Sequence, residues 1–239
     1  MPGLYKDEGV VLKTIKLGEA DRIVTLFTRG HGKVRAVAKG IRKTKSRFGG
    51  RLEPFTQVDL LVYRGRNLDV ITQAAIIDSF RAMRSDLAGL TAAAALAETV
   101  DKLTPDRERA FSTYALLLGG LQALTIAGPS SIVPAFLVKL LSLSGYHPQL
   151  GVCAGCGAGE EMRFFSPVMG GAICDVCRVE ERGALHVPAD RLRLLARLLA
   201  ADFGQTAEPQ AVSEVTHVLK RYVEYHLERP LRSLDLLAT

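Results

Sequence analysis

Four cysteines in two pairs are the residues of this chain whose type and spacing are best suited to chemistry. Two residues separate Cys153 from Cys156 and two separate Cys174 from Cys177, and 17 residues lie between the pairs. Two tight knuckles joined by a linker of this length can close four thiolates around one tetrahedral ion. The spacing therefore predicts one structural zinc ion (Zn2+) per chain, with these four cysteines as its ligands.

Two other interpretations of the cysteines are separate redox pairs and buried apolar thiols. Neither pair follows the strand and helix pattern of a thioredoxin-like site, and four thiols within 25 residues are too concentrated for scattered core positions. Because protein fills all four positions, the ion keeps no open site for water or substrate, and we expect it to build structure rather than to catalyse. His147 and His186 flank the segment as possible substitute ligands, which four thiols make unnecessary.

A long basic run without acids is the second feature. From Arg22 to Leu52 the chain holds ten Lys and Arg and no Asp or Glu. A surface that serves only solubility can carry charges of both signs. A run of positive charges alone therefore favours a polyanion partner, namely nucleic acid, over a merely solvated surface. Since side chains alternate along a strand, we expect the basic side of residues 33–39 to face outward beside a basic loop over 40–54. The candidate contacts are Lys33, Arg35, Lys39, Arg42, Lys43, Lys45, Arg47 and Arg51.

The composition is that of an ordinary folded chain. Its 239 residues are 48% hydrophobic and 23% charged, and the mean hydropathy is +0.14. The net charge of +6 lies at the front, because residues 1–80 hold 15 basic and 8 acidic side chains whereas residues 81–239 hold 16 and 17. No run of 18 apolar residues occurs, and residues 1–9 carry three charges where a secretory signal needs an apolar core. We expect a cytoplasmic protein with no membrane partner.

Short segments in which apolar and polar residues alternate dominate the first 80 residues. Strands are predicted at about 8–16, 21–28, 33–39, 55–63 and 68–74. Five strands with a long connection after the third are typical of an OB-fold barrel, although a five-stranded SH3-like barrel has a similar pattern.

Helical spacing of alanine and leucine follows from residue 80 onward. Helices are predicted at 91–103, at 106–124 with Pro105 near its first turn, and at 129–143, 188–201 and 209–228. The predicted fold is α+β and multidomain. It consists of an OB-fold β-barrel that binds nucleic acid (1–80), an all-helical domain (81–150 and 184–239) and an inserted zinc ribbon with four cysteine ligands (151–183).

Several catalytic motifs do not occur. The chain has no G-x-x-x-x-G-K-[ST], no H-E-x-x-H and no G-x-S-x-G, and acids are sparse in its basic half. We therefore expect that this protein is not an enzyme. Two alternatives from other classes are a zinc-ribbon RNA-binding or transcription-associated module and a metal-dependent nuclease stabilised by zinc.

Several stretches along the whole chain resemble the RecO family of bacterial recombination mediators. They are residues 18–29 (GEADRIVTLFTR), Gly32-Lys33, 38–40 (AKG), 45–47 (KSR), 52–55 (LEPF), 140–141 (LL), 145–148 (GYHP), the paired cysteines and 229–233 (RPLRS). The resemblance implies an N-terminal OB fold, a helical C-terminal domain and, in many members, a zinc module.

The same resemblance implies a role in DNA repair and recombination. Members bind single- and double-stranded DNA and anneal complementary strands without ATP. They act with the partner RecR to help load RecA onto DNA coated by single-strand-binding protein. The expected location is then the nucleoid, and the eight basic candidates become candidate DNA contacts.

Overall fold

The computed structural model describes residues 3–127, 130–159, 161–202 and 207–237. The chain divides into two compact units, residues 1–127 and residues 128–239. Each unit has its own elements and its own core, so the two are described separately. The predicted domain boundaries after residues 80, 150 and 183 stay predictions.

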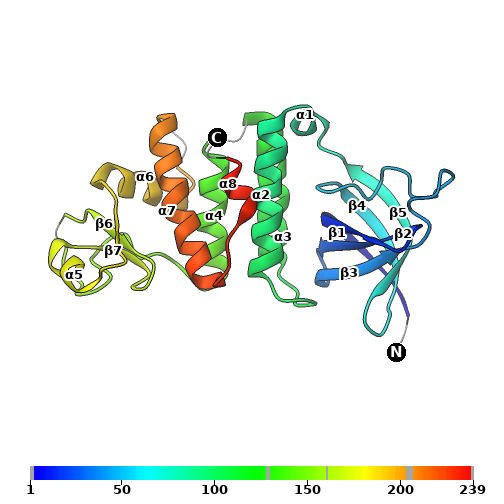
Figure 1. Cartoon of the computed structure of the whole chain (residues 1–239), viewed down its shortest axis with the longest axis horizontal. Coiled ribbons are helices and arrows are strands. Elements are labelled where there is room, and N and C mark those ends of the chain that lie inside the picture. Colours follow the sequence, from blue (N-terminus) through cyan, green and yellow to red (C-terminus); the bar gives the residue numbers. More distant parts are fainter. Residues whose placement is uncertain (1–2, 128–129, 160, 203–206, 238–239) are drawn as a thin grey trace. The chain divides into compact units, whose positions relative to one another are not determined.

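A closed five-stranded barrel begins the first unit (Figure 1). Its strands are β1 (Leu4–Leu17), β2 (Asp21–Thr28), β3 (Gly32–Ala38), β4 (Gln57–Tyr63) and β5 (Asp69–Asp78). The strand order is β1-β2-β3-β5-β4, and β4 pairs back onto β1. All pairs are antiparallel except β3 with β5. The predicted OB-like barrel is thus confirmed, with strand limits within a few residues of those expected.

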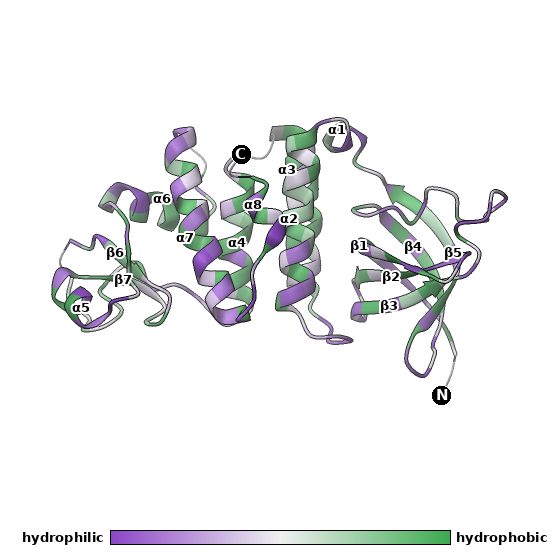
Figure 2. Ribbon diagram, viewed as in Figure 1, coloured by the Kyte–Doolittle hydropathy of each residue, from purple (hydrophilic) through white to green (hydrophobic). Residues whose placement is uncertain are grey.

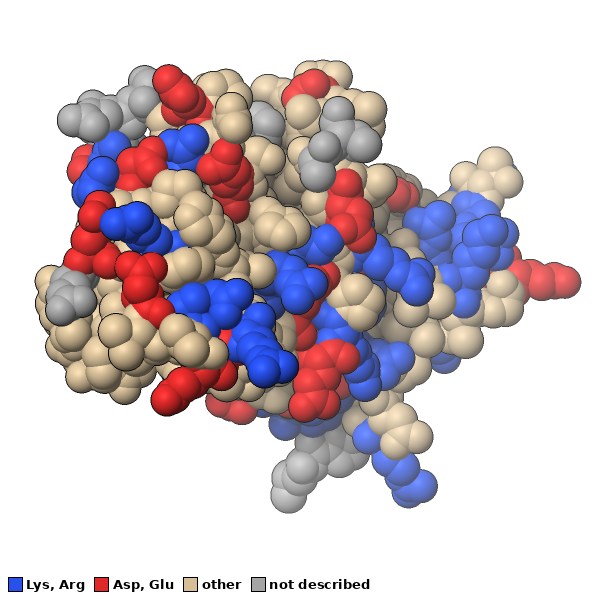
Figure 3. Space-filling view, turned by 60° about the vertical axis from the view of Figure 1, so that its left-hand side comes forward, with Lys and Arg blue, Asp and Glu red and all other residues tan. Residues whose placement is uncertain are grey.

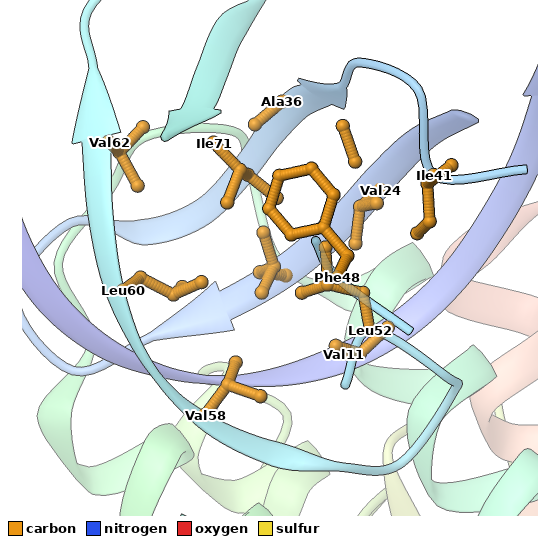
Figure 4. Packing of buried hydrophobic residues seen from close by; sticks show 12 residues of the cluster. Val11, Val24, Ala36, Ile41, Phe48, Leu52, Val58, Leu60, Val62 and Ile71 are labelled. Atoms are coloured by element: carbon orange, nitrogen blue, oxygen red, sulfur yellow. The ribbon is translucent and has the colours of Figure 1, made fainter. Parts of the chain in front are cut away.

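Alternate side chains of the strands fill the barrel, because the side-chain period of a strand is two. The long connection between β3 and β4 supplies three further apolar side chains to this core. Figure 4 shows Phe48 in the middle of the packed cluster, with Leu52 and Ile41 beside the strands. The buried cluster consists of Val11, Val24, Leu26, Ala36, Ala38, Ile41, Phe48, Leu52, Val58, Leu60, Val62 and Ile71.

Three helices complete the first unit: α1 (Arg81–Arg84), α2 (Leu87–Leu103) and α3 (Phe111–Ala127). Asp86 caps α2 by accepting a hydrogen bond from the backbone N–H of Gly89 at 2.9 Å. The prediction that the second helix begins at residue 106 is wrong.

The connection before α3 pairs with the barrel instead of continuing the helix. The backbone N–H of Arg107 donates to the carbonyl of Lys33 at 2.8 Å. The Arg107 guanidinium also bonds the buried Asp69 carboxylate at 2.8 Å. Asp69 in turn accepts from the Tyr5 hydroxyl at 2.6 Å. The Arg107 backbone and side chain are thus both bonded to the barrel, and α3 begins only at Phe111.

Four helices form the helical part of the second unit: α4 (Ile132–Leu143), α6 (Ala189–Leu199), α7 (Pro209–Leu227) and α8 (Arg232–Asp235). α4 packs against α6 and α7 and is apolar along most of its length (Figure 2). α7 buries one apolar stripe, which consists of Val212, Val215, Leu219 and Tyr222. Residue 129, where the α4 helix was predicted to begin, lies outside the described residues.

A small ribbon containing the cysteines lies between α4 and α6 in the sequence. Its three strands, β6 (Phe164–Ser166), β7 (Gly171–Ile173) and β8 (Leu185–His186), form a sheet of order β7-β6-β8. A short helix, α5 (Asp175–Glu180), follows β7. Among the helices of the described ranges, none is long and apolar enough to cross a membrane.

Candidate metal centre and nucleic-acid interface

The four cysteines come together within the ribbon. Their sulfur atoms all lie within 4.8 Å of one another, and Cys156 Sγ is 3.8 Å from Cys174 Sγ. Sulfurs about 2.3 Å from a central zinc would be separated by about 3.8 Å in a regular tetrahedron. The donor set and its spacing therefore fit a four-thiolate zinc site, as the sequence predicted.

Local backbone geometry shapes both knuckles. The N–H of Gly157 donates to the carbonyl of Cys153 at 2.8 Å, and the N–H of Arg178 donates to that of Cys174 at 3.0 Å. A Cβ atom on Gly155 would lie 2.8 Å from the sulfur of Cys177, so glycine permits the two knuckles to approach. Each pair is thus held in a tight turn, and Gly155 in the first turn leaves room for the sulfur of Cys177 in the second.

The thiols differ in their protonation. Burial opposes ionisation of Cys153, but hydrogen bonds from the backbone N–H groups of Cys156, Cys174 and Gly155 lower its pKa to about 6. The pKa of Cys177 is raised to about 12, and the hydrogen bond with the Cys153 side chain is the largest cause. A thiolate already favoured at neutral pH is a ready first ligand for a metal ion.

The two flanking histidines lie elsewhere in the described structure. His147 bonds the Ser142 hydroxyl at 2.7 Å, and His186 packs edge-on against Phe164 with ring centroids 5.5 Å apart. The residues that gather as possible metal ligands there are the four cysteines alone. This arrangement agrees with the expectation that the site does not need His147 or His186.

Seven of the eight predicted nucleic-acid contacts are exposed on the barrel and its β3–β4 loop. They are Arg35, Lys39, Arg42, Lys43, Lys45, Arg47 and Arg51. Within the described part of the chain none of these seven forms an ion pair. Lys and Arg side chains gather over the barrel region at the right of Figure 3, with few acids between them. Their charges are thus available to an outside partner.

The basic loop is anchored to the barrel at several points. Its backbone is tied to the β1–β2 turn, because Gly40 N–H donates to Asp21 at 2.7 Å and Arg42 N–H donates to the carbonyl of Ala20 at 3.0 Å. The Arg51 guanidinium donates to the carbonyl of Phe48 at 3.1 Å. With Phe48 in the core, the cations are displayed from a fixed segment rather than from a free coil.

Lys33 differs from the other candidates, and the prediction that it faces outward is wrong. The residue is only 9% exposed, because the C-terminal end of α2 and the connection that follows it cover this end of β3. The ammonium donates to the carbonyls of Asp101 and Thr104, both at 2.6 Å, and lies 3.3 Å from the Asp106 carboxylate. It thereby satisfies carbonyls at the C-terminal end of α2.

Two more of the ten cations in the basic run have acidic partners. Arg22 pairs with Glu53 at 3.4 Å, and Arg29 pairs with Glu8 at 3.7 Å. Sequence reasoning had no means of separating these paired cations from the unpaired ones. It also missed the anchoring role of Ile41, Phe48 and Leu52, although three apolar residues within a basic loop were a usable signal.

The comparisons with known proteins cover both units. The family model "Recombination protein O N terminal" matches residues 1–80, and "Recombination protein O C terminal" matches residues 84–235. A DNA repair protein RecO of Nocardioides sp. is 44% identical over 241 residues, covering 97% of this chain and 98% of the relative. That of Streptomyces coelicolor is 44% identical (97% of each chain), and that of Frankia casuarinae is 46% identical (98% of each).

Proposed function

This chain belongs to the recombination protein O family of DNA repair proteins, and from that membership we propose that it is a non-enzymatic mediator of homologous recombination. It binds single- and double-stranded DNA through its N-terminal barrel. It anneals complementary strands without ATP and acts with RecR to help load RecA onto DNA coated by single-strand-binding protein.

The observation that carries the proposal is the set of seven exposed cations without acidic partners in the described chain. Two complementary strands repel each other until their phosphates are neutralised. A fixed basic surface that holds one strand while it tolerates the second lowers this barrier, and no covalent chemistry is needed. Lys33 is left out of the proposed DNA surface, since its charge is used inside the protein.

The remaining parts receive structural roles in the proposal. Residues 1–80 are the DNA-binding domain, residues 81–150 and 184–239 the helical domain, and residues 151–183 the zinc module. One zinc ion held by the four cysteines supplies stability to a ribbon too small to fold through its own core. The partnership with RecR and with single-strand-binding protein, and the nucleoid location, rest on family membership alone.

Annealing of two complementary oligonucleotides tests the proposal directly. One strand carries a fluorophore and the other a quencher, and the protein is added without nucleotide. We expect faster quenching at low salt, with the acceleration decreasing as salt rises. No acceleration at any salt would contradict the proposal. Tighter binding to RNA than to DNA of the same sequence would favour the RNA-binding alternative, and strand cleavage with magnesium would favour a nuclease.

A further inference from the structure

The four cysteines of the candidate metal centre differ in their exposure to solvent. Cys156 is exposed and Cys177 is half-buried, whereas Cys153 and Cys174 are each only 2% exposed. The reactivity of a cysteine toward a dissolved reagent depends on access as well as on ionisation. A small reagent that reaches this cluster from water therefore meets Cys156 first.

The exposed sulfur has a buried sulfur as its close neighbour. Cys156 Sγ lies 3.8 Å from Cys174 Sγ, and the two residues belong to different knuckles of the ribbon. A disulfide bond is about 2.05 Å long, so these two atoms need to approach by less than about 2 Å to be bonded. The Cys153 sulfur instead accepts the backbone N–H of Cys174 at 3.4 Å, which partly occupies its electron pairs.

The half-buried Cys177 is covered on one side by a methionine. A Cβ atom on Gly155 would lie 2.8 Å from Cys177 Sγ and 3.1 Å from Met169 Sδ, so these two sulfur atoms lie close together over Gly155. Met169 is partly buried and packs against the cysteine cluster. The packing of the ribbon thus shields Cys177 and leaves Cys156 accessible.

Cysteines that bind zinc are thiolates, and the thiolate is the nucleophilic form of the residue. A thiolate attacks one oxygen of hydrogen peroxide, the O–O bond breaks, and the products are a sulfenic acid and one hydroxide. A second thiolate then attacks the sulfenic sulfur, an S–S bond forms, and a second hydroxide leaves. The two sulfur atoms together lose the two electrons that the peroxide gains. The reaction therefore needs one exposed thiolate and one close thiolate partner.

We propose that Cys156 is a modification site at which hydrogen peroxide oxidises the metal centre, with Cys174 as the resolving thiol that completes a disulfide between the two knuckles, an inference that rests on the proposed zinc site and adds redox control to it. After oxidation the cluster keeps two thiolates of four, and it releases the ion because a structural zinc site needs four ligands. The ribbon then loses the metal that stabilises it, until a thiol reductant restores the ligands.

Zinc release and disulfide mapping test the proposal on the full chain. The zinc content of the purified protein is measured first, and hydrogen peroxide is then added in an amount equal to the protein. A chromogenic chelator follows free zinc, and peptide mass mapping locates disulfides after the remaining thiols have been blocked. We expect about one zinc ion to be released for each disulfide formed, with the Cys156–Cys174 bond predominant. Dithiothreitol followed by added zinc should restore the original zinc content.

The possible failures of this experiment have distinct meanings. A protein purified without zinc would overturn the proposed zinc site together with this inference. Zinc retained in a large excess of peroxide, or disulfides formed mainly within each knuckle, would overturn the inference and leave the zinc site intact. Loss of zinc that dithiothreitol does not reverse would indicate oxidation beyond the disulfide, which contradicts a reversible switch.

Limited alkylation then tests whether exposure selects the reactive sulfur. The zinc-loaded chain is treated with less iodoacetamide than protein, and we expect the first label on Cys156. Met169→Ala removes the cover of Cys177 and should raise the share of label on that residue severalfold. Val168→Ala, at the neighbouring position, which is 58% exposed, is the matched control and should leave the distribution unchanged. A first label on Cys177 in the unmodified chain, or an unchanged distribution in Met169→Ala, would contradict selection by exposure.

Discussion

The Arg47 guanidinium lies over the ring of Phe48, 4.9 Å from its centre, and that ring is completely buried in the barrel core. One residue of the proposed DNA surface is therefore in direct contact with the neighbouring residue that anchors the loop. Because cation and anchor are adjacent in the sequence, the position of the charge depends on the packing of the core. The basic loop should then lose its effect on DNA when its anchor is removed.

Phe48→Ala tests this coupling. Deletion of a buried aromatic ring leaves a cavity, and we expect the free energy of unfolding to fall by about 3 to 5 kcal/mol. DNA affinity should decrease under conditions in which the variant is still folded, because the loop is no longer held. Urea denaturation and anisotropy with labelled DNA measure the two effects. Thr44→Ala, at an exposed position of the same loop, is the control and should affect neither.

Charge reversal tests the basic surface. Lys39→Glu, Arg42→Glu and Lys43→Glu together should weaken binding to DNA of every sequence by a similar factor. If each cation neutralises one phosphate of a single strand, the slope of log affinity against log salt should become less steep by about 2. Salt titrations by anisotropy measure the slope. A loss confined to one sequence would contradict recognition of the backbone.

A matched reversal on the second unit controls for net charge. Arg193→Glu, Arg221→Glu and Arg229→Glu change three exposed positions by the same amount. If this trio lowers DNA affinity as much as the first, overall charge rather than the barrel surface determines binding.

Lys33→Met should lower the stability of the protein and leave the salt dependence of DNA binding unchanged. The substitution leaves the carbonyls of Asp101 and Thr104 without their donor, which is expected to cost about 1 to 3 kcal/mol in the free energy of unfolding. The salt dependence of DNA binding should not change, since this ammonium is covered by α2. Denaturation and salt titration of the same preparation check both statements. A less steep salt slope with unchanged stability would return Lys33 to the DNA surface.

His226 predicts a pH dependence of stability. It packs against Tyr146 with ring centroids 3.8 Å apart, and its buried Nε2 has no hydrogen-bond partner among the described residues. Burial lowers the pKa of His226 below the ordinary 6.5. The unfolded chain therefore takes up a proton at this residue before the folded chain does, so the stabilisation is complete above about pH 6.5 and decreases as the pH falls below it.

His226→Phe should weaken this dependence, because phenylalanine keeps the ring contacts and cannot be protonated. Thermal melting of both proteins between pH 8 and pH 5 measures it. His217→Phe, at an exposed position of the same helix, is the control and should retain the dependence. Parallel melting curves for the unmodified chain and for His226→Phe would contradict the prediction.

Metal analysis tests the four-cysteine site. We expect about one zinc ion per purified chain and well below one in Cys156→Ser. A strong chelator should lower the melting temperature of the unmodified chain and have little effect on the variant. His147→Ala and His186→Ala should both keep the zinc, and loss of the metal from either would revise the ligand set.

Local features of this protein follow from its sequence. The alternation of apolar residues in the first 80 positions predicted five strands, and the cysteine spacing predicted the thiol cluster. Both are short-range properties, because strand period and knuckle geometry depend on neighbours only a few positions away. The stripe of α7 was predictable for the same reason.

The role of each basic residue was decided only by the tertiary structure. Lys33 and Arg35 are equivalent in the strand pattern, but α2, more than 50 residues later in the chain, covers the first and leaves the second exposed. Likewise, Phe48 belongs to a loop by sequence and to the core by packing. Burial depends on which distant segment packs over a position, and strand periodicity carries no information about that.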